Sequence, residues 1–241
     1  MSYIPLSQFI PPETLATLIP PPPTPSNPLT TLHHQRFTSP TSASSLGHVE
    51  FVFDLGNWSP DPAFSAPSST KKYASMLQIL QYPFSRGSIH ITPDKRLSID
   101  PGYYAGVNGD LDLEITLHAQ RFAEKICATQ PLAGILRGQV SPSPEESGSD
   151  EALREWIRRV MVTDWHPVGT CAMIGGGMER GGVVDERLRV YGVKGLRVVD
   201  ASVMPLQISA HLQATVYAIG EKGAAMVLED WGVGGLAKGC E

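Results

Sequence analysis

The sequence holds 241 residues, 41% hydrophobic and 18% charged, which is enough for one large domain or two small ones with a hydrophobic core. Its 19 basic and 24 acidic residues give a formal net charge of −5, which argues against nucleic acid or an anionic membrane as a partner. Three scattered cysteines, Cys127, Cys171 and Cys240, cannot build a disulfide framework or a four-cysteine metal site, so we predict a reducing compartment and no metal.

Neither a membrane span nor a secretion signal is visible. No apolar run approaches the roughly 18 to 20 residues that a spanning helix needs. The opening residues, MSYIPLSQFIPP, lack both a basic start and an apolar stretch. We therefore expect no membrane partner and a cytoplasmic location. The alternative is a secretion signal upstream of this sequence, which leaves the location open.

Proline is concentrated near the N-terminus, where 13 of the 21 prolines lie within residues 1–67. Residues 11–47 are also rich in serine and threonine and have no sustained apolar period. This composition is typical of segments that cannot offset their ordering entropy by burial. We predict a disordered tail over residues 1–48 and a second, short tail over residues 232–241.

From residue 49 onward, apolar residues recur with the periods of strands and helices. Residues 49–55 predict a strand, and residues 88–100 predict a hairpin, because isoleucines alternate with polar residues before a Pro-Asp turn. Apolar steps of three and four residues predict amphipathic helices over 111–126 and 153–161. We predict one domain over residues 49–164, with a mixed or antiparallel sheet and flanking helices.

The C-terminal part changes pattern once more. The apolar run LRVVD at 196–200 predicts a strand, and apolar residues near one face of 214–228 predict a last helix. Blocks of strands and helices followed by a final strand and helix indicate the α+β class. We predict that residues 165–231 form a part of their own.

The strongest candidate for chemistry is His166, in the segment WHPVGTCAM. Pro167 biases His166 out of the helical region, so the preceding helix is expected to stop and the imidazole to occupy a defined loop. An imidazole, with an ordinary pKa of about 6.5, suits general acid or base work. The alternative is a histidine that caps the helix C-terminus.

Two further positions lie close to the last helix. His211 stands at the entrance to that helix, where backbone N–H groups without partners suit an anionic ligand edge; the alternative is a loop histidine that binds water. Asp200 and Ala201 follow the apolar run at what would be the carboxyl end of a strand, a common ligand position. The alternative for Asp200 is an N-cap or turn residue.

Other positions favour structural roles. Residues 175–177 are three glycines without a helix pattern behind them, so they predict a flexible loop and not a nucleotide-binding turn. Cys171 has no second cysteine at metal-ligand spacing and predicts a small buried residue. Four further histidines fall in the predicted tail, a strand and a helix: His33, His34, His90 and His118.

The ordered blocks WHPVGTCAM, GGVVDERLRVYGVKGLRVVDASVMP and SAHLQATVYAIGEK resemble the C-terminal signature of the glucose-methanol-choline (GMC) oxidoreductases of fungal type. Upstream, QYPFSRGSIHIT and SIDPGYY are similar to the substrate domain of that family. The resemblance covers roughly residues 49–231. It implies a GMC substrate-binding domain together with the last strand and helix of an FAD-binding domain.

The resemblance further implies FAD as cofactor and a small-molecule alcohol as substrate. His166 matches the family's catalytic base, and His211 matches the second member of the catalytic pair. Asp200 and Ala201 match positions that contact the pyrophosphate and ribityl region of FAD, and His211 and the following Leu212 match those that line its pyrimidine end. Trp165 is a further cofactor-binding residue that the resemblance implies.

The chain departs from the family in lacking the G-x-G-x-x-G unit that binds the ADP half of FAD. Three interpretations follow. The first is an FAD-dependent alcohol oxidoreductase, seen here in truncated form. The second is an inactive remnant, or half of a split enzyme that pairs with a complementary FAD-domain chain through an exposed apolar surface. The third is a flavin-containing lyase that uses the two histidines without redox change.

Overall fold

The computed structural model describes residues 1–22, 28–59 and 72–233 of the chain. The chain divides into two compact units. Unit 1 comprises Met1–Ser26 and Thr30–Asp164, and unit 2 comprises Asn27–Leu29 and Trp165–Glu241. Within the described ranges, no helix combines the length and apolar character that crossing a membrane requires.

A three-stranded antiparallel sheet forms the centre of unit 1. Its strand order is β1 (Ser2–Ile4), β2 (Val49–Asp54) and β3 (Ser75–Leu80). The predicted strand over 49–55 is confirmed as β2, whose valines and phenylalanines suit a pleated, half-buried surface. Sequence patterns gave no indication of β3, although all six of its residues pair with β2.

The predicted disordered tail over residues 1–48 is wrong for the described part of that segment. Besides β1 it forms η1 (Leu6–Gln8), α1 (Pro12–Leu18), α2 (Pro28–Thr38) and α3 (Pro40–Ser45). The prolines stand at the first position of α1 and α3, where the missing N–H costs no hydrogen bond. Leu6, Ile10 and Phe37 are buried, so burial in the core offsets the ordering entropy.

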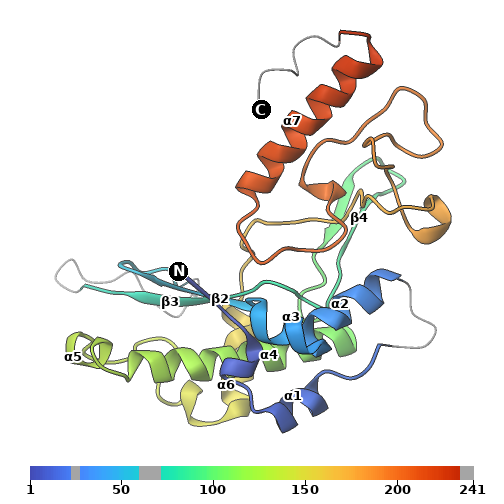
Figure 1. The fold of residues 1–241 in the computed structure, drawn as a ribbon. Coiled ribbons are helices and arrows are strands. Elements are labelled where there is room, and N and C mark those ends of the chain that lie inside the picture. The colour runs from blue at the N-terminus through green and yellow to red at the C-terminus, as the bar shows by residue number, and fades with distance from the viewer. Residues whose placement is uncertain (23–27, 60–71, 234–241) are drawn as a thin grey trace. The chain divides into compact units, whose positions relative to one another are not determined.

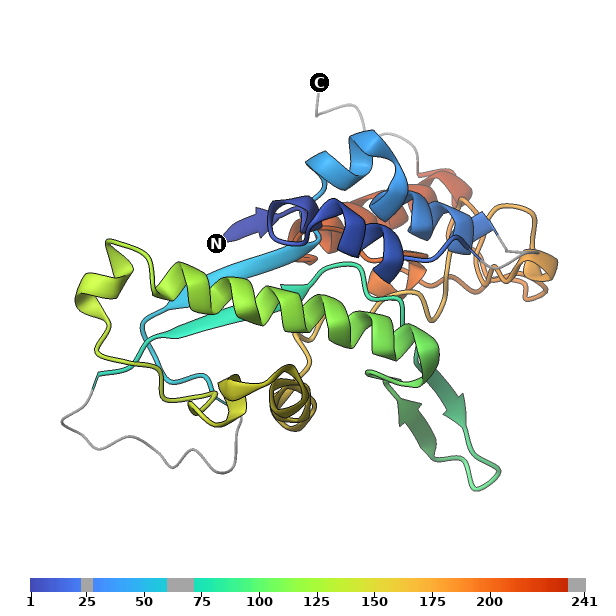
Figure 2. The same ribbon diagram turned by 90° about the horizontal axis from the view of Figure 1, so that it is seen from below.

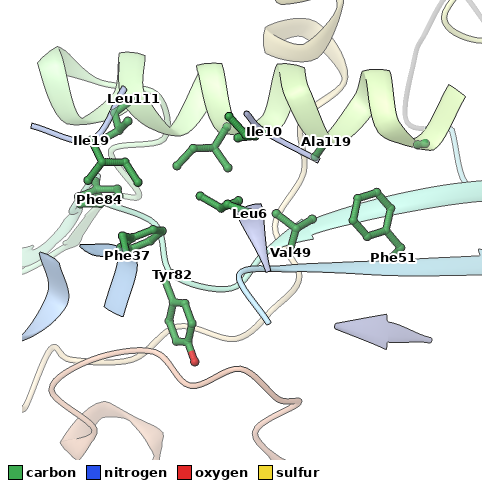
Figure 3. Close-up of a cluster of buried hydrophobic side chains, with 12 residues drawn as sticks. Leu6, Ile10, Ile19, Phe37, Val49, Phe51, Tyr82, Phe84, Leu111 and Ala119 are labelled. Carbon is green, nitrogen blue, oxygen red and sulfur yellow. The ribbon is translucent and has the colours of Figure 1, made fainter. Parts of the chain in front are cut away.

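One long helix, α4 (Gly106–Cys127), packs beside the sheet (Figure 2). Figure 3 shows Leu111 and Ala119 of α4 facing Leu6, Ile10 and Phe51 across the core. The opposite face of α4 packs on α6 (Asp150–Val160) through a smaller apolar cluster. Both helices confirm the predicted amphipathic stripes, because each stripe meets a separate apolar partner.

Short elements complete unit 1. They are the antiparallel hairpin of β4 (Ser88–Ile91) and β5 (Leu97–Asp100), the single turn α5 (Leu132–Ile135) and η2 (Glu146–Gly148). The hairpin confirms the predicted alternation over 88–100. Its apolar side chains remain largely exposed, which is unusual for a face that is entirely aliphatic.

Unit 2 is built from loops, η3 (Met178–Arg180), η4 (Ala201–Val203) and the long helix α7 (Gln213–Asp230), drawn in red in Figure 1. Its core comprises Val184, Leu188, Val203 and Met226. The predicted strand at 196–200 is wrong in extent, because the described chain pairs it only through an isolated bridge at Arg197. The Val190 amide donates to the Leu196 carbonyl and the Val198 amide donates to the Leu188 carbonyl, so the pairing covers only about three residues on each side.

Candidate functional site

Two loop segments of unit 2 run alongside each other and carry the two predicted catalytic histidines. The amide of Cys171 donates to the Ser202 carbonyl over 3.0 Å, and the amide of Met173 donates to the Val203 carbonyl over 2.8 Å. Gly169 completes the first segment with a φ of +88°, which favours glycine. These backbone contacts fix the spacing between the segment that begins at Trp165 and the segment that ends at His211.

The imidazoles of His166 and His211 meet at the end of these segments. Nε2 of His166 lies 3.2 Å from Nδ1 of His211, a hydrogen-bond distance, and the ring centroids are 5.0 Å apart. The alternative in which His166 caps a helix is wrong, because α6 already ends at Val160. The structure therefore brings together two histidines that are 45 residues apart in the sequence.

A hollow of about 600 Å³ lies beside the pair and belongs entirely to unit 2. Its lining comes from the His166 segment, from η4 and from one face of α7: Trp165, His166, Pro167, Ala201, Leu212, Gln213, Val216, Tyr217, Gly220 and Glu221. The predicted residues Trp165, Ala201 and Leu212 all line it. His211 does not line the hollow itself but contacts His166, which does.

The N-terminal end of α7 offers unsatisfied donors to this hollow. Leu212 is the N-cap residue, and within the described chain no side chain caps the helix there. The first-turn N–H groups therefore remain available to an acceptor, and the helix dipole adds positive partial charge at this end. An acceptor-rich ring edge that gains negative charge on reduction, such as that of a flavin, fits this set of donors.

Asp200 adopts the alternative role that the sequence left open. Its Oδ1 accepts hydrogen bonds from the Ser202 amide at 2.8 Å and from the Ser202 hydroxyl at 2.5 Å, which makes it the N-cap of η4. It is exposed and is not among the residues that line the hollow. Asp200 thus holds Ala201 in place, and its carboxylate is not directed to the hollow by these contacts.

None of the remaining candidates is among the residues that line the hollow. His33 and His34, assigned to the tail, are buried in the core of unit 1, whereas His90 is exposed on β4. His118 is half-buried on α4, and Cys171 is half-buried instead of buried. Burial lowers the pKa of His33 to about 3, with the nearby Arg86 and Arg36 acting in the same direction.

Sequence reasoning missed most of the α7 contribution. One face of α7 lines the hollow through four residues at helical spacing: Gln213, Val216, Tyr217 and Gly220. Tyr217 falls within the predicted last helix over 214–228, and its side chain is 69% exposed. The available signal was the helical period itself, which groups these residues but cannot show which face meets a ligand.

Comparisons with known proteins place the chain in one family. Residues 83–220 match the family model described as GMC oxidoreductase. The dehydrogenase citC of Monascus ruber is 42% identical over 158 residues, which make up 64% of this chain and 24% of that protein. Glucose oxidase 1 of Penicillium expansum is 36% identical over 156 residues. The chain therefore spans about a quarter of the length of these curated relatives.

Solved structures give the same assignment. A fungal aryl-alcohol oxidase superposes with a TM-score of 0.64 and 30% identity, over 83% of this chain and 31% of that one. An Aspergillus oryzae formate oxidase, described in terms of its FAD modification, superposes with a TM-score of 0.66 and 29% identity, over 79% and 33%. The chain belongs to the GMC oxidoreductase family and holds the C-terminal, substrate-binding part of its fold.

Proposed function

We propose that this chain supplies the proton-transferring and flavin-facing side of an FAD-dependent alcohol oxidation. The observation that carries the proposal is the His166–His211 contact of 3.2 Å beside a hollow of about 600 Å³. When bound, FAD supplies the acceptor for the hydride that leaves the carbinol carbon. Trp165, Ala201 and Leu212 would hold its ring system, as would the first turn of α7.

The histidine pair is suited to accept the hydroxyl proton of an alcohol. Only one hydrogen can lie between Nε2 of His166 and Nδ1 of His211, whichever ring donates it. With both rings neutral, the two outer nitrogens then differ, because one carries a hydrogen and the other a lone pair. The outer lone pair is the proton acceptor, and the inner hydrogen bond fixes the tautomer of the ring that bears it.

A flavin titration tests this proposal directly. The full chain is titrated with FAD, alone and together with the nucleotide-binding part of GMC type proposed below, and flavin fluorescence reports binding. A panel of primary and secondary alcohols that includes benzyl alcohol and D-glucose is then added, one alcohol at a time and without oxygen, and loss of the oxidised-flavin absorbance reports reduction. His166→Ala should abolish reduction while FAD binding remains, and His118→Ala on α4 is the matched control. FAD uptake without reduction by any alcohol in the panel would refute alcohol oxidation.

The exposed face of the β4–β5 hairpin supports a second proposal. Ile89, Ile91, Leu97 and Ile99 share this face in register, with exposed fractions of 46%, 73%, 68% and 64%. Because the relatives contain a further three quarters of sequence, we propose that a nucleotide-binding part of GMC type covers the face. That part would also supply the missing site for the ADP half of FAD.

This second proposal predicts a measurable complex. The full chain is mixed with the separately expressed nucleotide-binding part of the Monascus ruber dehydrogenase, and the dissociation constant is measured. Ile91→Ser combined with Leu97→Ser should weaken binding by at least about 100-fold, because two aliphatic side chains lose their burial. Ser98→Ala on the opposite face of the hairpin is the control. A chain that stays monomeric and ignores this part would refute the proposal.

A further inference from the structure

Gln207 connects the two histidine-bearing segments through its side chain. Its Nε2 donates to the backbone carbonyl of His166 over 2.9 Å, and its Oε1 accepts from the amide of Ile208 over 3.2 Å. Gln207 is half-buried and is not among the residues that line the hollow. The amide group therefore bridges the backbone on both sides of the histidine pair.

The two residues beside His166 make the Gln207 contact matter for the position of its backbone. Trp165 adopts a φ of +54°, a left-handed conformation that is rare for a bulky residue and that its surroundings must hold in place. Pro167 follows His166 and has no N–H to offer, so it cannot contribute a backbone donor to the ladder between the segments. The hydrogen bonds that the Cys171 and Met173 amides donate lie further along the chain, at the far end of the segment.

From this arrangement we infer that Gln207 is the positioning residue of the histidine pair. By holding the His166 carbonyl, it sets where the imidazole of His166 projects relative to that of His211. A displacement of about 1 Å would lengthen the 3.2 Å contact beyond hydrogen-bond range. The inference rests on the proposed function only for what the pair does, since the geometry itself can be tested without FAD or substrate.

Nitrogen NMR of the full chain, labelled with ¹⁵N in its histidines, provides the test. A hydrogen bond between two imidazoles gives a scalar coupling between the nitrogens that it joins. We expect this coupling between His211 Nδ1 and His166 Nε2 in mildly alkaline buffer, with both resonances assigned from single His→Gln variants. Gln207→Ala should abolish the coupling and bring the ring nitrogen shifts close to those of independent imidazoles.

Two further variants make the result specific. Gln207→Glu keeps the size of the side chain but replaces the amide donor with a carboxylate, so it should also abolish the coupling even if the alanine variant fails to fold. Gln35→Ala changes an exposed glutamine of α2 and should leave the coupling intact. An unchanged coupling in folded Gln207→Glu would overturn the inference, as would its absence in the unmodified chain. Failure to bind FAD or to oxidise an alcohol would leave both NMR results standing.

Discussion

His33 makes the stability of unit 1 depend on pH. Its side chain is buried, and neither ring nitrogen has a hydrogen-bond partner within the described part of the chain. The ring instead packs against the rings of Phe84, at a centroid distance of 4.7 Å, and Phe37, at 5.5 Å. Burial in this aromatic cluster, reinforced by the charges of Arg86 and Arg36, lowers the pKa of His33 to about 3.

The lowered pKa fixes the sign of the effect. In the unfolded chain His33 has a pKa of 6.5 and binds a proton below that pH, whereas the folded state excludes the proton down to about pH 3. The contribution of neutral His33 to the free energy of unfolding is therefore complete above pH 6.5 and is lost as the pH falls from 6.5 towards 3. At roughly pH 5 the loss is about 2 kcal/mol, since each pH unit below the unfolded value costs about 1.4 kcal/mol.

Urea unfolding at pH 8 and pH 5, followed by circular dichroism, measures this loss. His33→Phe retains an aromatic ring beside Phe84 but cannot be protonated. We expect its free energy of unfolding to fall by about 2 kcal/mol less between the two pH values than that of the unmodified chain. His90→Phe makes the same change at an exposed position and should keep the original pH dependence. Equal pH dependence in the unmodified chain and in His33→Phe would refute the reasoning.

Three further predictions concern the site and the packing around it. His211→Ala removes one half of the histidine pair and should slow flavin reduction by about 100-fold or more, measured in the FAD-loaded protein. Asp112→Ala removes a buried carboxylate that accepts two backbone N–H groups and a hydroxyl, and urea unfolding should show a loss of about 3 kcal/mol. Gly223→Ala places a methyl group 2.4 Å from Val199, so it should lower the unfolding temperature, whereas Gly220→Ala, which meets open space, should not.

The predicted helices and hairpin were confirmed because the spacing of their apolar residues depends only on the local secondary structure. Apolar residues at helical spacing in α4 have to meet an apolar partner, and α4 meets the sheet on one side and α6 on the other. The prediction of a disordered tail over residues 1–48 was wrong because no such pattern is present there. The few apolar residues of this segment, such as Leu6 and Ile10, follow no period, and their burial depends on a surface that α4 provides from far along the chain.

The candidate site was predicted in its residues but not in its geometry. His166 and His211 were identified as a pair, whereas the 3.2 Å contact arises from backbone bonds between two loops. Gln207 gave no signal, because a side chain that binds a backbone carbonyl needs no particular partner in the sequence. For Asp200 the sequence left an N-cap role open beside the ligand role, and the structure shows the N-cap contact with the Ser202 amide.

The two ends of α7 differ: ion pairs hold its C-terminal end, and its N-terminal end faces the hollow. Glu229 and Asp230 are unfavourable at the negative end of a helix dipole. Arg187 forms ion pairs with both, at 3.1 and 2.9 Å, and Arg197 forms a second pair with Asp230. These arginines come from the loop that packs beneath the helix, so they neutralise the C-terminal charges and fix the helix to its own unit. At the opposite end, no side chain of the described chain caps the first turn, which can present its N–H groups to the hollow beside the histidine pair.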